Sequence, residues 1–285
     1  MRKFIAIILS LCTAVTLTSC SKGEAETPEA SDKPGITEGD NSGENENTGE
    51  NENTDENETE NGEDTAVDKV LDYEIDPAKP MIALTFDDGP NTTTTNQVLD
   101  LLQKYQVRAS FFLIGDNITD ASAEAVKRAF DMGCEIDNHS KSHPYMNEMT
   151  AEEIIAEVQF VSDKVEEITG QPTLFFRPPY IAVSDTMYDS IDMPFICGAG
   201  CDDWNASVDV DTRVKKIQRQ AHDGVIILLH DAEGNDQTVE ALDILIPDLL
   251  EKGYQFVTVK ELFEAKGVAI SGEDTNLYTT VEAAS

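Results

Sequence analysis

Two adjacent carboxylates, Asp87 and Asp88, follow the apolar run 81–86 and precede Gly89-Pro90, which turns the chain. Neighbouring carboxylates are costly to ionise together unless a positive charge compensates them. A metal ion held by one of them supplies that charge and leaves the other free to act as a base. The alternative is a solvated turn, since Asp-Gly-Pro is common turn chemistry.

Two of the four histidines, His139 and His143, lie four residues apart on a short polar segment. Imidazole nitrogens suit zinc and similar transition metals, so the spacing favours one shared ion, with paired surface histidines as the alternative. His230 ends the apolar run 225–229, where it is either a satisfied core histidine or a functional group.

Two further strand ends present polar groups. Arg177 follows an apolar pair and precedes Pro178-Pro179-Tyr180, and an arginine there can orient a carboxylate through charge-assisted hydrogen bonds. Asp203 precedes Trp204, the only tryptophan of the chain. Each signal is weak alone, and together they place ionisable or polar groups at a series of strand ends.

The elements that must position these groups alternate along the chain. Short apolar runs predict strands at 81–86, 109–114, 134–137, 174–176, 194–198, 225–229 and 255–258. Helical patterns lie at 94–106, 121–132, 150–169, 211–222, 237–252 and 260–266. In the third helix, Thr150 and Glu153 form a capping box and Gly170 follows the last turn. Strands interleaved with helices predict a parallel β/α architecture, barrel-like or doubly wound, with functional groups at the carboxyl ends of the strands.

In this order the motifs resemble the polysaccharide deacetylase family (the NodB-homology domain, carbohydrate esterase family 4). The matching segments are Thr-Phe-Asp-Asp-Gly-Pro at 85–90, His-Ser-Lys-Ser-His at 139–143, Arg-Pro-Pro-Tyr at 177–180, Asp-Trp at 203–204 and Leu-Leu-His at 228–230. The resemblance covers about residues 76–267. It implies an α/β fold, a distorted (β/α) barrel with about seven parallel strands.

The resemblance also implies a role for each residue. Asp87 would be the general base, oriented by Arg177, and His230 the general acid, held in its useful tautomer by Asp203. Asp88, His139 and His143 would bind one divalent transition metal ion, with zinc expected and cobalt or nickel as alternatives. The backbone N–H of Tyr180 would stabilise the oxyanion, and Trp204 and Leu228 would form the wall of the acetyl pocket.

Two positions depart from the family pattern. Many relatives have glycine after the Arg-x-Pro-Tyr motif, where this chain has Ile181, so we expect a narrower substrate groove. Many also have an aspartate three residues before Asp203, where this chain has Gly200. That difference concerns the geometry of the loop and leaves Asp203 in place.

The ends of the chain predict export and anchoring. Residues 1–20 resemble a lipoprotein signal peptide, in which Leu17-Thr18-Ser19-Cys20 makes Cys20 the lipidated first residue; an ordinary signal peptide is the alternative. Residues 21–75 are acidic and of low complexity, which predicts a disordered tether, and 268–285 a C-terminal tail. We therefore expect an extracellular bacterial lipoprotein on the cell membrane.

The formal net charge is −36, and no basic stripe is present. This argues against nucleic-acid binding and leaves the lipid anchor as the expected membrane contact; a monomer is expected. Beyond Cys12 and Cys20, three cysteines remain: Cys134, Cys197 and Cys201. Cys197 and Cys201 can pair with each other, or all three can be buried thiols.

The predicted reaction is removal of acetyl groups from a β-linked glycan, with an N-acetylglucosamine polymer such as peptidoglycan favoured. An acetylxylan esterase, which removes O-acetyl groups, is the alternative enzyme. A non-catalytic glycan-binding surface lipoprotein is the alternative of another class. A glycosidase pair is a poor interpretation of Asp87 and Asp88, because adjacent residues cannot flank a glycosidic bond.

Overall fold

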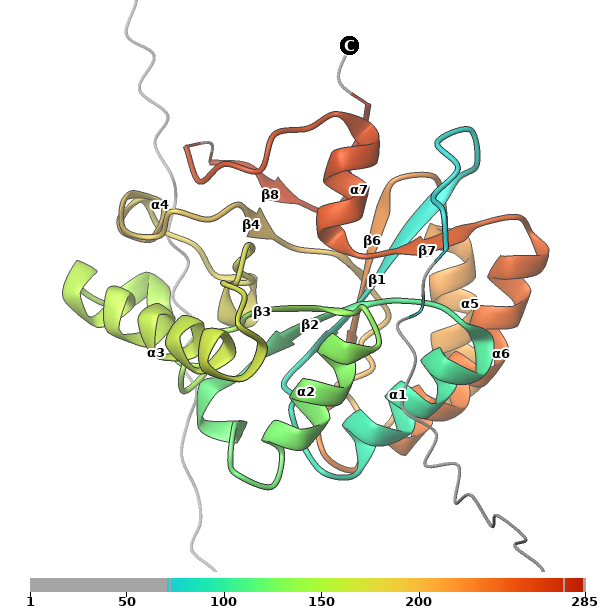
Figure 1. Cartoon of the computed structure of the whole chain (residues 1–285), viewed down its shortest axis with the longest axis horizontal. Helices are drawn as coiled ribbons and strands as arrows, with labels where there is room; N and C mark the ends of the chain where they lie inside the picture. Colours follow the sequence, from blue (N-terminus) through green and yellow to red (C-terminus); the bar gives the residue numbers. More distant parts are fainter. Residues whose placement is uncertain (1–70, 72, 274, 284–285) are drawn as a thin grey trace, which may run out of the picture. The chain divides into compact units, whose positions relative to one another are not determined.

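Helices and strands alternate along the part of the chain that the structure describes, residues 71, 73–273 and 275–283 of a computed structural model (Figure 1). The strands are β1 Met81–Asp87, β2 Ser110–Leu113, β3 Glu135–Asn138, β4 Phe195–Ile196, β5 Ala199–Gly200, β6 Val225–His230, β7 Gln255–Val257 and β8 Leu277–Tyr278. The α-helices are α1 Thr94–Tyr105, α2 Ala123–Asp131, α3 Ala151–Thr169, α4 Asp185–Ser190, α5 Val210–Gln220, α6 Asp236–Glu251 and α7 Val259–Lys266. Three 3₁₀ turns lie at Gly115–Asn117, Met146–Glu148 and Pro179–Ile181. Cys20, the signal peptide and nearly all of the predicted tether lie outside the described residues.

The strand pairings follow a distorted barrel. The sheet order is β3-β2-β1-β6-β5, all parallel, and β7 pairs with the first half of β1. Isolated bridges join Asn138 to Phe176 and Phe176 to Phe195, which begins β4. Backbone neighbours therefore run from β1 through β2, β3 and residue 176 to segment 195–200, then to β6 and back to β1. This confirms the predicted α/β barrel type.

The alternation of side chains along β1 decides which residues reach the barrel interior. Ile82, Leu84 and Phe86 pack outward in the large core cluster that α1 and α6 cover. Met81 and Ala83 belong to the inner cluster. Since successive side chains of a strand point to opposite faces, Asp87 points inward at the carboxyl end. The same alternation in β6 brings His230 inward, directly opposite Asp87 in the register.

The helices form where the sequence pattern placed them. In α3 the capping box of Thr150 and Glu153 is present, and Gly170 ends the helix in the left-handed conformation at φ 70°. Ile154, Val161 and Val165 of the apolar stripe are buried. The short α4 was not predicted. None of the helices in the described residues combines the length and the apolar character that crossing a membrane requires.

The predicted strand 174–176 is reduced to the bridges at Phe176, and the reason is a side chain. Oδ1 of the buried Asp137 accepts the N–H groups of both Leu174 and Phe175, each at 3.0 Å. These donors are therefore taken by a carboxylate in place of a neighbouring strand.

The predicted C-terminal tail also differs, because part of it belongs to the fold. β8 pairs in parallel with β4, and Val281 is 1% exposed in the inner core cluster. The N–H of Val281 donates to the carbonyl of Gly224 at 2.8 Å. At the other end Leu71 is buried, so the fold begins before the expected boundary at residue 76.

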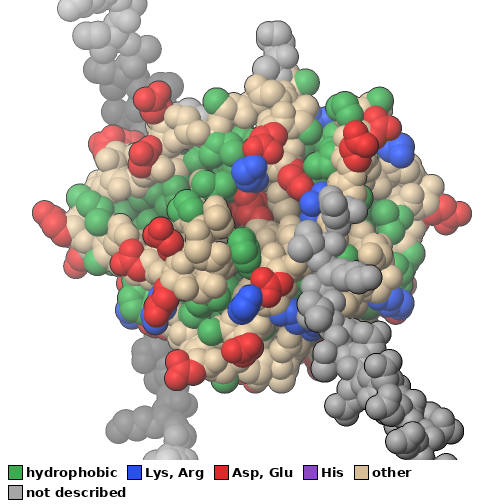
Figure 2. All heavy atoms as spheres, in the orientation of Figure 1, with side chains coloured by type: hydrophobic (Ala, Val, Ile, Leu, Met, Phe, Trp, Pro, Cys, Tyr) green, Lys and Arg blue, Asp and Glu red, His purple; other side chains and the backbone are tan. Residues whose placement is uncertain are grey.

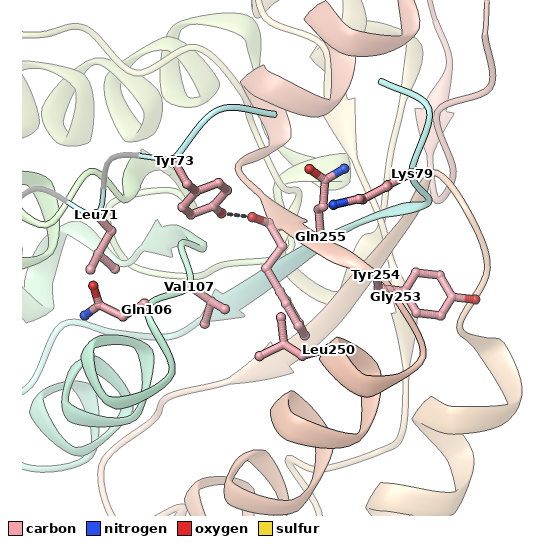
Figure 3. Close-up of a pocket in the computed structure, with 10 residues that line it drawn as sticks. Leu71, Tyr73, Lys79, Gln106, Val107, Leu250, Gly253, Tyr254 and Gln255 are labelled. Carbon is pink, nitrogen blue, oxygen red and sulfur yellow. Dashed lines mark hydrogen bonds between the residues drawn. The ribbon is translucent and has the colours of Figure 1, made fainter. Parts of the chain in front are cut away.

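A pocket of about 410 Å³ lies where the chain enters the domain, at the amino ends of β1 and β7 (Figure 3). Tyr73 reaches across it, and its hydroxyl donates to the carbonyl of Phe256. None of the residues predicted to do chemistry lines this pocket. Figure 2 shows acidic side chains spread over one face of the molecule, in keeping with the strongly negative charge.

Candidate active site

The base predicted at the end of β1 is buried and paired. Asp87 is 2% exposed, and its Oδ1 accepts a hydrogen bond from Nη1 of Arg177 at 2.5 Å. Nη2 of Arg177 donates to the carbonyl of Cys197 at 2.5 Å, and its guanidinium lies 4.1 Å from the centre of the Phe112 ring. Arg177 is thus locked from three sides, and its hydrogen bond orients the Asp87 carboxylate.

Asp88, His139 and His143 bring one ligand atom each to within 4.8 Å of one another. Oδ1 of Asp88 lies 3.6 Å from Nε2 of His139 and 3.7 Å from Nε2 of His143. Ligands about 2.0–2.2 Å from a tetrahedral ion are about 3.4 Å apart. Oδ1 of Asp88 is buried and lacks a hydrogen-bond partner among the described residues, which is what an ion would correct. The three residues fit a metal ion.

The protonation of the two histidines suits ligation. Nδ1 of His139 lies 2.7 Å from the carbonyl oxygen of Arg177, which can only accept, so Nδ1 carries a proton and Nε2 is the nitrogen that faces Asp88. Burial, and then the neighbouring His139, lower the pKa of His143 and favour its neutral form. Arg177 therefore contributes to the site twice, through its side chain to Asp87 and through its carbonyl to His139.

The loops that carry the site have unusual backbone conformations. Within the described residues, six of the seven non-glycine residues with positive φ lie in these loops: Asp88, Ser140, His143, Tyr180, Ile181 and Asp202. Ile181, with φ of 54°, is the most unfavourable because it is β-branched. Such strain clusters at functional sites, where the surrounding structure imposes it.

His230 is held by Asp203, which follows β5. Nδ1 of His230 lies 2.8 Å from Oδ1 of Asp203, and the backbone N–H of His230 donates to Oδ2 at 2.8 Å. Burial by itself lowers the pKa of His230, but the hydrogen bond and charge of Asp203 outweigh it and raise the pKa to about 9. Burial opposes the ionisation of Asp203, yet the contacts with His230 hold the pKa of Asp203 below its usual value. Asp203 thus favours the protonated form of the His230 imidazole.

Tyr180, Trp204 and Leu228 line the same cavity of about 470 Å³. Tyr180 and Trp204 are exposed at its mouth. The ring of Tyr180 stacks on that of Tyr145 at 4.0 Å and meets His143 edge-on at 4.5 Å. The cavity thus has aromatic surfaces at its rim.

The structure brings the predicted residues together. The predicted residues that line the cavity are Asp87, Asp88, His139, His143, Tyr180, Asp203, Trp204, Leu228 and His230, and Arg177 lies behind Asp87. Their individual roles remain predictions. The three cysteines are free thiols, and burial raises the pKa of Cys134 and of Cys201 to about 12.

Several residues at the site escaped the sequence analysis. Tyr145 stacks on Tyr180 from a different loop, and Thr238 donates to Oδ2 of Asp203 at 2.8 Å. Arg213 is buried and donates to Thr238. Only Arg213 left a signal in the sequence, since it is a charged residue on the otherwise apolar stripe of α5 with Val214 and Ile217.

Comparison with known proteins identifies the family of the chain. Residues 74–193 match the family model for polysaccharide deacetylase. A bifunctional xylanase/deacetylase of Pseudobutyrivibrio xylanivorans is 50% identical over 66% of this chain and 31% of its own length. A peptidoglycan-N-acetylglucosamine deacetylase of Bacillus cereus is 36% identical over 68% of this chain and 93% of its own length.

Among solved structures, a family 4 acetyl xylan esterase from Clostridium thermocellum, in complex with a cobalt ion, is 39% identical with a TM-score of 0.69. That likeness covers 70% of this chain and 98% of the other. The chain spans between 31% and 40% of the length of the first curated relatives that it matches. The barrel, the motifs and these likenesses show that the chain belongs to the polysaccharide deacetylase family.

Proposed function

We propose that the chain hydrolyses acetyl groups from a β-linked polysaccharide. The observation that carries the proposal is the register of β1 and β6, which pairs Asp87 with His230 beside the metal-binding triad. A carboxylate that takes a proton then faces an imidazolium that gives one, as hydrolysis of an amide or ester requires. Family membership supports the same reaction.

Asp88, His139 and His143 would hold the ion, and two imidazoles with one carboxylate are a ligand set of catalytic zinc sites. We propose zinc as the native ion, with cobalt and nickel as alternatives. When bound, such an ion polarises the acetyl carbonyl and makes water more acidic.

The chain's own residues move the protons. Asp87 accepts a proton from the attacking water as the water oxygen bonds to the acetyl carbon. The backbone N–H of Tyr180 donates to the carbonyl oxygen as negative charge develops on it. The bond from the acetyl carbon to the sugar nitrogen or oxygen then breaks, and Nε2 of His230 protonates the leaving atom. Acetate and a free amine or hydroxyl result.

The cavity suits an acetylated sugar. Leu228 and Trp204 offer apolar surface for the acetyl methyl group. Trp204 is 68% exposed, and the stacked pair Tyr145 and Tyr180 presents a second exposed aromatic face. Exposed aromatic surface at the mouth of a cavity is suited to the apolar faces of sugar rings.

Two polymers are candidates. Our first candidate is an N-acetylglucosamine polymer such as peptidoglycan, because the chain matches 93% of a peptidoglycan-N-acetylglucosamine deacetylase. Acetylated xylan is the second, favoured by the 50% identity to a xylanase/deacetylase. Activity on xylan alone would reject the first candidate.

The test is acetate release from both polymers with the metal content measured in the same preparation. We expect one transition metal ion per chain, activity lost with chelator, and activity lost in Asp87→Asn and His139→Ala. His222→Ala is the matched control, since His222 is exposed and hydrogen-bonds to Gln220 and Thr280, away from the cavity. A metal-free protein that releases no acetate would support the alternative, a non-catalytic glycan-binding protein.

We also propose that the chain is an extracellular lipoprotein anchored through Cys20. The lipoprotein box and the acidic segment after it support this proposal. Cys20→Ser should abolish lipid labelling and release the protein from the membrane fraction. Cys12→Ser is the matched control, because Cys12 lies within the signal peptide. Membrane retention of the Cys20 variant would reject the anchor.

A further inference from the structure

Arg213 in α5 is a buried cation without a direct counter-charge. It is 1% exposed, and the hydrogen bonds that it makes within the described residues all go to carbonyl, amide or hydroxyl oxygens. Its Nε donates to the carbonyl of Val208 at 2.8 Å, and its Nη1 donates to Asn235 Oδ1 and Thr238 Oγ1, both at 2.7 Å. A buried charge is costly unless polar groups or an opposite charge compensate it, and Asn235 and Thr238 are the two side chains that accept hydrogen bonds from Nη1.

Both side chains connect Arg213 to Asp203. Thr238 Oγ1 lies 2.8 Å from Oδ2 of Asp203. Asn235 Nδ2 lies 3.4 Å from the same oxygen and 2.8 Å from the carbonyl of His230. Thr238 and Asn235 therefore each bridge the guanidinium of Arg213 and the carboxylate of Asp203 through hydrogen bonds.

The direction of every hydrogen bond in these routes is determined. A guanidinium only donates, so Thr238 Oγ1 and Asn235 Oδ1 must accept from Arg213. The single hydroxyl proton of Thr238 then points at Asp203, and the amide of Asn235 turns its NH₂ group toward Asp203 and the His230 carbonyl. Oδ2 of Asp203 also accepts the backbone N–H of His230, and only Oδ1 remains for the imidazole.

We infer that Arg213 is a positioning residue that acts through Thr238 and Asn235 to keep Asp203 ionised and aligned. By making Asp203 less basic, it limits how strongly Asp203 stabilises the protonated form of His230. A carboxylate that accepts several hydrogen bonds is a weaker base than an isolated one. His230 must release its proton to the leaving group. Without the hydrogen bonds from Thr238 and Asn235, Asp203 would be more basic and would make His230 a poorer acid. This inference rests on the proposed function of His230.

Other charges also act on His230, and they bear on any pH profile. Apart from His230 itself, the carboxylates and histidines that line the two cavities beside it are Asp87, Asp88, His139, His143, Asp202, Asp203, Glu233 and Asp236; Tyr180, Cys197 and Arg213 also line them, and Asp231 follows His230 in the chain. The test must therefore alter the relay and leave these groups in place.

The experiment compares pH–rate profiles of the metal-loaded, full-length protein and its variants on the acetylated polymer that it hydrolyses. Thr238→Val removes one donor from Asp203 at nearly constant volume. We expect the basic limb of kcat to move up by roughly one pH unit, because the loss of a hydrogen bond makes Asp203 more basic. We expect kcat near pH 7 to fall roughly three- to tenfold, because His230 becomes a weaker acid. Thr238→Ser should restore both.

Arg213→Gln should shift the limb in the same direction, since it weakens the relay and removes a cation that repels protonated His230. Arg219→Gln is the matched control: the same substitution on the exposed face of the same helix, expected to leave the profile unchanged. Thr173→Val removes a buried hydroxyl that hydrogen-bonds to Ser162 and controls for lost packing. Folded, metal-loaded Thr238→Val with an unmoved limb, or with a limb moved to lower pH, overturns the inference.

A second readout does not depend on activity. In the zinc-loaded protein, the Nδ1 proton of His230 should move in the ¹H NMR spectrum of Thr238→Val and not in that of Thr173→Val. If the wild type releases no acetate from either polymer, the proposed function fails, and this resonance still tests the relay. An unchanged resonance in Thr238→Val contradicts it.

Discussion

Asp203→Asn should move the pH dependence of the reaction by a predictable amount. Asp203 is the main reason why the pKa of His230 lies at about 9, against an ordinary value of 6.5. Oδ2 of Asp203 accepts from the His230 N–H and from Thr238, so the asparagine must place its NH₂ group at the other position, facing Nδ1. A donor there disfavours a protonated Nδ1, and the pKa of His230 should fall by about 2.5 units or more.

The consequence for activity follows from the fraction of protonated His230. At pH 8 this fraction is about 90% for a pKa of 9 and about 3% for a pKa of 6.5, so Asp203→Asn should lose activity about 30-fold from protonation alone. At pH 5.5 the two proteins should differ little on this account. A bound cation lowers both values through its charge, so the measured quantity is the separation between the two basic limbs of kcat/KM.

The same shift has a consequence for stability. The pKa of His230 is about 9 in the folded protein and 6.5 in the unfolded chain, so protonation of His230 stabilises the folded protein. This stabilisation is complete below pH 6.5 and disappears as the pH rises through 9. The difference in free energy of unfolding between wild type and Asp203→Asn should therefore shrink by up to about 3 kcal/mol between pH 6 and pH 9.5, measured by urea denaturation. Asp211→Asn, an exposed aspartate of α5, is the control. Coincident basic limbs for wild type and Asp203→Asn would refute the reasoning.

Three further perturbations test the remaining parts of the site. Arg177→Met leaves Asp87 buried without its cation and should cost about 3–5 kcal/mol in urea denaturation, whereas the exposed Arg219→Met should cost under about 0.5 kcal/mol; equal losses would contradict the role of the pair. Gly89→Ala would put a Cβ 2.6 Å from Oδ2 of the buried Asp231, so either that side chain or the loop with Asp88 must move; we expect the loop to move and zinc affinity to fall at least about tenfold by competition titration. Gly200→Ala, whose nearest contact would be 3.6 Å, should keep its zinc, and unchanged affinity in both variants would reject the argument. Tyr145→Ala should lower kcat/KM about two- to tenfold by removing the ring that supports Tyr180, and Tyr145→Phe should not; a loss in both would assign the effect to the hydroxyl.

The sequence was sufficient to predict the parts of the site that follow strands. In a parallel barrel the carboxyl ends of the strands meet, so side chains at the ends of β1, β3 and β6 had to converge. The inward direction of Asp87 and His230 came from the structure, in which side chains alternate between the two core clusters along β1 and β6. The capping box of α3 was equally predictable, because it depends on residues three apart in the sequence.

What the sequence did not reveal depends on contacts between distant segments. The apolar residues at 174–176 predicted a strand. In the structure, however, Asp137, nearly forty residues earlier, accepts the hydrogen bonds of two N–H groups of this segment. The two-residue β8 is too short for any periodicity, and Val281 is buried in the inner core cluster, beside the distant Gly224 that accepts its N–H. The stacking of Tyr145 on Tyr180 likewise joins two loops that no local pattern relates.

The left-handed residues around the cavity bear on how this domain can be engineered. Each such non-glycine residue costs roughly 1–2 kcal/mol, so glycine at Ile181 or His143 relieves strain wherever the side chain is dispensable for folding. A selection for heat resistance alone will therefore find some of its easiest gains in the loops that we propose bind the ion and the sugar. Thermostable variants of this domain should be selected for acetate release in the same round, since otherwise melting temperature will rise as turnover disappears.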